Sequence, residues 1–107
     1  MPPSISALSP FGQRLQALRL REGIAQDRLG VILGLEESSS SARMSRYENG
    51  IHEPPVSFVQ KLAAYFNVPV AYFYCEDDQL AELVAAFPHM TQQSREHVLD
   101  IVRGQQL

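Results

Sequence analysis

Apolar residues in the first two-thirds of the chain recur at spacings of three and four, as in helices with one buried face. Phe11, Leu15 and Leu18 share the first such face. The preceding Ser9-Pro10 pair is typical of a helix start, because serine caps the backbone and proline fits the first turn. Gly23 is placed to end this helix. The pattern therefore predicts an amphipathic helix bounded by a serine and a glycine.

Two shorter helices are predicted next, separated by a polar stretch. The first covers residues 26–33 and is closed by Gly34, and the second covers about 41–48 and stops at Asn49-Gly50. Residues 36–41 between them consist of glutamates and serines, and serine favours caps and turns. We expect this stretch to be a linker-like loop, with a capping cluster as the alternative.

A fourth amphipathic helix follows a proline-rich break at residues 53–55. Its apolar face is predicted to bury Val56, Val59, Leu62, Ala63 and Phe66. A short fifth helix is predicted within residues 68–73. No segment alternates apolar and polar residues in the way of a half-buried strand. The predicted fold class is all-α.

The last third of the chain predicts two more amphipathic helices, over about 77–87 and 91–103. Pro88 separates them, Thr91 is placed to cap the second, and Gly104 is placed to end it. Two short helices joined in this way predict a C-terminal helical hairpin.

Charge is distributed unevenly along the 107 residues. The chain has a net charge of −3, whereas nucleic-acid-binding domains are usually basic. Residues 1–75 carry a net charge of +1, and residues 76–107 carry −4. DNA binding through a local basic patch is compatible with this pattern, and tight non-specific binding is not. The basic side chains expected to be ordinary surface charges are Arg14, Arg21, Arg28 and Lys61.

Few residues suggest catalytic or metal chemistry. Cys75 is the only cysteine, which excludes an internal disulfide and favours a reducing compartment. The N-terminus lacks the features of a signal peptide, and the apolar run at 68–75 is far shorter than the roughly 20 residues that span a bilayer. His52, His89 and His97 share no metal-ligand spacing. We expect a cytoplasmic protein that is no enzyme, uses no metal or cofactor and has no membrane partner.

The third predicted helix has the polarity that a DNA groove requires. Met44 and Tyr47 are predicted to face the core, while Ser41, Arg43 and Arg46 face outward. Small side chains allow a close backbone approach, and arginine can bond to guanine or to phosphate. Two short helices separated by a turn, with packing helices around them, form a device that presents one helix to the major groove.

Four segments in this order resemble the Cro/C1-type helix-turn-helix transcriptional regulators, the xenobiotic response element family. They are GQRLQALR (12–19), QDRLG (26–30), MSRYENG (44–50) and LAAYFNV (62–68). The resemblance extends over residues 11–73. It implies a five-helix, lambda-repressor-like bundle that binds double-stranded DNA. It also implies a sequence-specific regulator, expected to be a dimeric repressor at an inverted-repeat operator.

The resemblance implies seven DNA contacts. Gln26, Arg43 and Asn49 match or adjoin positions that contact the phosphate backbone. The candidates for contact with base edges are Ser41, Ala42 and Arg46, and Ser40 beside them is also expected to contact DNA.

The resemblance also implies that Arg19 and Glu48 form an ion pair between the first helix and the end of the recognition helix. This chain departs from the family at the turn, where residues 35–40 add about four residues. The insert either loops outward or lengthens the recognition helix at its N-terminus. Ala25 stands at the N-cap position of the second helix, where serine or threonine would stabilise it more.

We expect three parts: a flexible arm (1–9), the DNA-binding domain (10–75) and a helical extension (76–107). The extension could pack onto the bundle or pair with a second copy. Because helix-turn-helix modules gain affinity and palindromic specificity as dimers, we expect a homodimer. The residues expected at its interface are Leu80, Leu83, Val84, Phe87, Val98, Ile101 and Val102. The acidic extension is alternatively a site for a protein partner.

Two other functions remain open at this point. An antitoxin or a restriction–modification controller would have the same module, and a neighbouring gene would identify it. A protein-interaction adaptor with weak DNA affinity belongs to a different class. The net negative charge favours it, as do Glu36 and Glu37 beside the recognition helix, because carboxylates repel phosphates.

Overall fold

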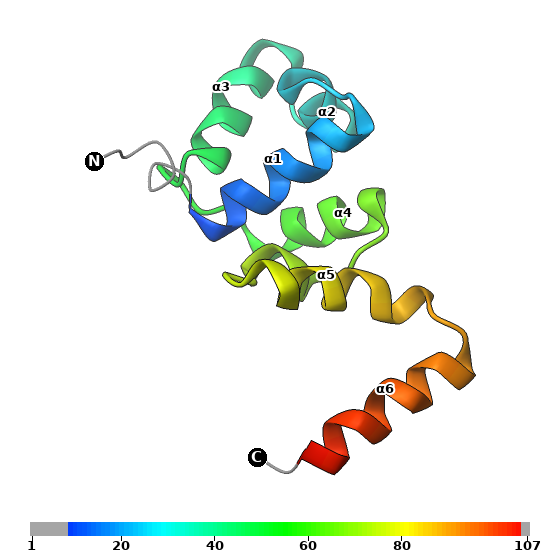
Figure 1. The fold of residues 1–107 in the computed structure, drawn as a ribbon. Coiled ribbons are helices and arrows are strands. Elements are labelled where there is room, and N and C mark those ends of the chain that lie inside the picture. The colour runs from blue at the N-terminus through cyan, green and yellow to red at the C-terminus, as the bar shows by residue number, and fades with distance from the viewer. Residues whose placement is uncertain (1–8, 106–107) are drawn as a thin grey trace.

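The regular elements of the chain are helices throughout residues 9–105, the part that the computed structural model describes (Figure 1). They are α1 (Pro10–Glu22), α2 (Gln26–Ile32), α3 (Glu37–Glu48), α4 (Val56–Phe66), the 3₁₀ helix η1 (Val70–Tyr74), α5 (Asp78–Ala86), the 3₁₀ helix η2 (Phe87–His89) and α6 (Gln92–Gln105). The all-α prediction is confirmed. Apart from Ser9, the predicted N-terminal arm lies outside the described residues. No helix in the described part is long and apolar enough to cross a membrane.

Helix α1 begins and ends where the sequence predicts. The Gly12 N–H donates to the Ser9 hydroxyl at 3.0 Å, which makes Ser9 the N-cap. Gly23 adopts a left-handed conformation (φ 68°) that residues with a Cβ rarely take, and it closes the helix. Helix α2 follows Ala25, which provides no side-chain cap, as expected.

One cluster of buried apolar side chains holds α1 to α4 and η1 together. Those with 2% exposure or less are Leu15, Leu18, Leu29, Met44, Val59, Leu62 and Phe73, together with Ala81 of α5. The prediction that Val56 is buried is wrong, since 63% of it is exposed. Val56 is the first residue of α4, where the chain arrives from an exposed loop.

The serine-rich stretch is helical, so the prediction of a linker-like loop is wrong. Helix α3 starts at Glu37, four residues before the predicted start. Four residues are about one helical turn, and the insert therefore lengthens the recognition helix at its N-terminus. A negative charge at Glu37 suits the first turn of a helix, and Ser40 in this stretch is fully buried.

Two glycines allow α3 to lie very close to its neighbours. A Cβ on Gly12 of α1 would stand 1.8 Å from the backbone oxygen of Glu48 in α3. A Cβ on Gly30 of α2 would stand 2.0 Å from the Ser40 hydroxyl oxygen. Contacts this short are impossible for real side chains, so the spacing of α3 from α1 and from α2 depends on both glycines.

Arg14 is not the surface charge that the sequence predicts. It is buried, and its Nε donates to the Cys75 carbonyl at 2.9 Å. Its guanidinium also donates to the Glu76 carbonyl at 3.2 Å and pairs with the Asp78 carboxylate at 2.9 Å. These partners lie more than 60 residues along the chain, which is why a local pattern does not reveal them. Arg14 thus ties α1 to the beginning of α5.

The two predicted C-terminal helices are present, and they diverge. Helix α5 packs against η1, while α6 runs away from the bundle (Figure 1). The corner between them is fixed by the His89 imidazole, which lies 2.8 Å from the Asn67 carbonyl, and by Arg95, which lies over the Phe87 ring.

Helix α6 starts as predicted and ends later than predicted. The Ser94 N–H donates to the Thr91 hydroxyl at 3.1 Å, so Thr91 caps the helix. The helix then continues through Gly104 to Gln105. The prediction that Gly104 ends it is therefore wrong. Glycine within a helix costs only about 1 kcal/mol relative to alanine, so the last turn can include it.

Candidate nucleic-acid interface

Helices α2 and α3 form a helix-turn-helix with a turn of four residues, 33–36. Helix α3 packs on the bundle through one buried stripe, which consists of Ser40, Met44, Tyr47 and Glu48. Met44 and Tyr47 face the core as the sequence predicts.

The opposite face of α3 is open to solvent. Ser39, Ala42, Arg46 and Asn49 follow one another at spacings of three, four and three, so they lie in line on one side of the helix. Ala42, Arg46 and Asn49 are exposed and Ser39 is partly exposed. Arg46 is the one long side chain in this row, which we call the outer face of α3.

The prediction that Ser40 contacts DNA is wrong. Its side chain is 0% exposed, and its hydroxyl donates to the Asp27 backbone oxygen at 2.7 Å. Ser40 therefore joins α3 to α2. Ser39 is the outward serine that the sequence pattern does not single out, although counting back from Arg46 in steps of four and three leads to it.

Ser41 and Arg43 are exposed on the two flanks of the outer face. Among the described residues, Arg28, Arg43 and Arg46 have no hydrogen-bond or ion-pair partner. The other basic side chains of residues 10–75 are engaged, three in ion pairs and Lys61 with the Leu33 carbonyl. The unpaired arginines of this segment are therefore all on the helix-turn-helix.

A buried polar network fixes the end of α3. Arg19 Nε donates to Glu48 Oε2 at 2.6 Å, so the ion pair implied by the resemblance is formed. Another Arg19 nitrogen donates to the Ile24 carbonyl at 3.0 Å. Gln26 Nε2 donates to Glu48 Oε1 at 3.0 Å. The network connects α1, the first residue of α2 and the end of α3. A phosphate contact from Gln26 stays a prediction.

Asn49 follows α3 directly and lies in line with Arg46. Its amide donates to the Ser45 hydroxyl at 3.2 Å, and the side chain is exposed. At the other end of α3, Glu36 and Glu37 are exposed carboxylates. The interface is thus favourable to phosphate near Arg43 and Arg46 and unfavourable at the start of the helix.

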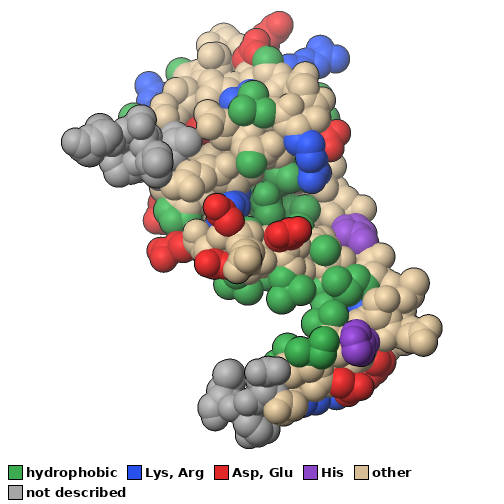
Figure 2. Space-filling view, viewed as in Figure 1, with side chains coloured by type: hydrophobic (Ala, Val, Ile, Leu, Met, Phe, Trp, Pro, Cys, Tyr) green, Lys and Arg blue, Asp and Glu red, His purple; other side chains and the backbone are tan. Residues whose placement is uncertain are grey.

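The residues expected at a dimer interface lie on the C-terminal helices. Figure 2 shows hydrophobic side chains gathered over this part of the molecule. Leu80, Leu83, Ile101 and Val102 are exposed, and Val84, Phe87 and Val98 are partly buried. Within the described structure they do not form one closed core.

Comparisons with known proteins place this geometry in a family. Residues 10–72 match the family model described as a helix-turn-helix domain. The "Uncharacterized HTH-type transcriptional regulator RghRB" of Bacillus subtilis (strain 168) is 40% identical over 63 residues, which are 58% of this chain and 42% of that relative. The matched segment thus spans less than half of the relative's length.

A solved structure extends the similarity beyond the bundle. The crystal structure of the transcriptional regulator BswR is 38% identical, with a TM-score of 0.77 over 87% of this chain and 92% of that chain. The family match covers more than half of the chain and agrees with the helix-turn-helix geometry of α2 and α3. The chain therefore belongs to the helix-turn-helix domain family.

Proposed function

We propose that this protein is a sequence-specific DNA-binding transcriptional regulator that places α3 in the major groove. The observation that carries the proposal is the outer face of α3, directly opposite its buried stripe. Ser39 and Ala42 are small enough to let the helix approach the bases. Arg46 lies between Ala42 and Asn49 and can donate two hydrogen bonds to guanine O6 and N7.

Phosphate contacts would hold the helix in register. Arg43 is exposed beside the outer face, and Asn49 ends it. Gln26 is fixed through Glu48 to the end of α3, so a phosphate bound at Gln26 would be positioned relative to Arg46. Contacts of this kind determine orientation and leave sequence selection to the groove.

The protein is proposed to act as a homodimeric repressor at an inverted repeat. Helix α6 has 14 residues and extends away from the bundle, and isolated helices of about 12–15 residues are only marginally stable in water. Ile101 and Val102 on α6 and Leu83 on α5 expose apolar surface. A second copy would cover this surface and bring two α3 helices to one duplex.

The first experiment is selection of random duplex DNA by the purified protein at moderate salt, followed by sequencing. Enrichment of an inverted repeat is the expected result, and the distance between its halves gives the dimer geometry. Absence of enrichment from folded protein, with the salt lowered as well, would contradict the proposal. That outcome would favour an adaptor, since Glu36 and Glu37 at the start of α3 repel phosphate.

The substitution Ile101→Asp tests the proposed homodimer separately from DNA binding. A charge at this exposed apolar position is expected to leave the bundle folded and to convert the dimer to monomers in sedimentation equilibrium. Gln93→Asp, at an exposed polar position of α6, is the matched control and is expected to stay dimeric. If the unmodified chain is monomeric at high micromolar concentration, the proposed dimer is wrong.

A further inference from the structure

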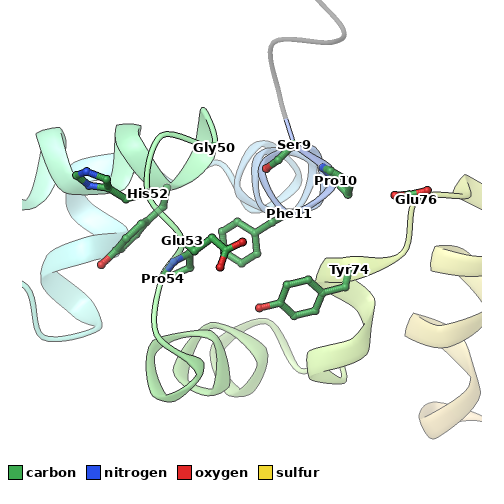
Figure 3. A pocket seen from close by; sticks show the side chains of 10 residues that line it. Ser9, Pro10, Phe11, Gly50, His52, Glu53, Pro54, Tyr74 and Glu76 are labelled. Carbon is green, nitrogen blue, oxygen red and sulfur yellow. The ribbon is translucent and has the colours of Figure 1, made fainter.

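A cavity of about 310 Å³ lies between three distant parts of the chain (Figure 3). Its walls come from the first turn of α1, the end of α3 with the loop that follows it, and the end of η1 with Glu76. Small-molecule sites usually measure about 300–1,000 Å³, so this volume suits a small ligand. No residue of the outer face of α3 lines it, and the cavity is thus separate from the proposed DNA contacts.

Three aromatic rings from three elements line the cavity: Phe11 of α1, Tyr47 of α3 and Tyr74 of η1. Phe11 and Tyr47 are buried in the core, which holds their rings in place. Tyr74 is 53% exposed, with its ring centroid 6.1 Å from that of Phe11. In Figure 3 the Tyr74 hydroxyl is directed towards the segment that carries Glu53. The cavity therefore combines fixed aromatic walls with an accessible ring.

The charged side chains that line the cavity are carboxylates, while the Arg14 guanidinium lies next to it and donates to the Glu76 backbone oxygen. Glu53 and Glu76 line it, as does His52, and no lysine or arginine does. Among the described residues, neither carboxylate forms an ion pair. Carboxylates repel an anionic ligand, and the faces of aromatic rings attract cations. We propose that this cavity binds a small organic cation, with an ammonium group near Glu53 and an apolar body against Phe11 and Tyr74.

Because of where the cavity lies, we expect a ligand bound there to change the affinity for DNA. This expectation rests on the proposed function. Gly50 of the lining directly follows Asn49, the proposed phosphate contact, and His52 stands two residues further along. The Glu53 carboxylate in this loop repels a phosphate that approaches Asn49. A bound cation neutralises it, so the ligand raises the affinity for DNA.

The ligand site is tested without DNA, on the full chain, by titration with benzyltrimethylammonium monitored through amide NMR shifts. Saturable shifts are expected at Phe11, Glu53 and Tyr74, and none with phenylacetate, an anion with a similar ring. Glu53→Gln and Tyr74→Ala are each expected to weaken binding by about fivefold or more.

The matched controls for these variants are Glu82→Gln and Tyr65→Ala, at exposed positions of α5 and α4 that do not line the cavity. Both are expected to bind the cation as the unmodified chain does. Equal binding of both probes, tighter binding of phenylacetate, or shifts that do not saturate would each overturn the proposed site.

The effect on DNA is measured separately, with the duplex obtained by selection. Saturating benzyltrimethylammonium is expected to lower the apparent Kd for this duplex by about two- to tenfold, and to have no effect on Glu53→Gln. If the cation binds and the Kd stays unchanged, the coupling is overturned. If no duplex is selected, the proposed function fails, and the ligand site is judged on the NMR titration alone.

Discussion

The bundle of residues 10–75 and the two C-terminal helices differ in how much of their apolar surface they bury. In the bundle, Leu15, Val59 and Leu62 are completely buried within one chain. In the C-terminal helices, Ala81 is buried, whereas Leu83 and Ile101 are 41% and 50% exposed. The bundle thus has a core of its own, although it also exposes Leu20 and Ile51, whereas Ala81 is the one buried apolar side chain that the described part of the C-terminal helices contributes.

The buried polar and charged side chains also lie in the bundle. The bundle buries Arg19, Glu48 and Ser40, each with a hydrogen-bond partner, and no buried side-chain nitrogen or oxygen in the described part lacks one. Such satisfied networks fix the position of α3 inside a single chain. The orientation of the proposed recognition helix is therefore built into the bundle, while the distance between two such helices depends on what covers the extension.

The largest expected effect is loss of the buried ion pair. Arg19→Met would leave the Glu48 carboxylate, which is 1% exposed, without its guanidinium. We expect the free energy of unfolding measured with urea to fall by about 3–5 kcal/mol. Arg21→Met, at an exposed pair on the same helix, is expected to change it by less than about 0.5 kcal/mol. Equal effects of the two variants would contradict a bundle organised around this pair.

The second largest expected effect is a difference in stability between alanine substitutions at one glycine of the bundle and one of the C-terminal helices. Gly12→Ala is expected to destabilise the chain by about 1–3 kcal/mol, because its Cβ would overlap the backbone of Glu48. Gly104→Ala in α6 meets nothing within 4 Å and is expected to be neutral or stabilising by up to about 1 kcal/mol. Thermal unfolding of both variants checks this. Destabilisation by Gly104→Ala as large as that by Gly12→Ala would show that α6 is tightly packed.

The smallest expected effect on stability comes from alanine substitution of two adjacent serines, which differ in what they contact. Ser40→Ala removes the hydrogen bond to Asp27 and is expected to cost about 1 kcal/mol of stability without changing base preference. Ser39→Ala is expected to leave stability unchanged and to alter the selected DNA sequence, since Ser39 lies on the outer face of α3. Urea unfolding and repeated selection give the two measurements. The reverse result would restore Ser40 as the DNA contact.

Local signals predicted much of the fold. Ser9 and Gly23 bound α1 because a cap and a left-handed glycine act within a few residues. The start of α3 was missed because serines favour turns when considered alone, whereas here Ser40 packs against α2. The prediction that Arg14 is a surface charge is wrong for a similar reason. Its partner, the Cys75 carbonyl, is distant in sequence, so a local pattern does not reveal the contact.

The candidate site was predictable to the extent that it follows the family pattern. The pairing of Arg19 with Glu48 and the exposure of Arg46 correspond to positions in the matched segments. The prediction that Ser40 contacts DNA is wrong because the four-residue insert changes which serine lies outward. The pattern of the C-terminal helices predicted apolar faces, and a single sequence does not specify what covers them.

The central claim is that the outer face of α3 selects the DNA sequence, and Arg46→Ala tests it most directly. Binding of the variant is measured on the selected duplex and on duplexes that differ at single positions, with Arg21→Ala as the control. We expect a loss of preference at one position of each half-site, worth about 1–3 kcal/mol, and an unchanged profile for the control. A uniform loss of affinity for all duplexes would contradict the claim and make Arg46 a phosphate contact.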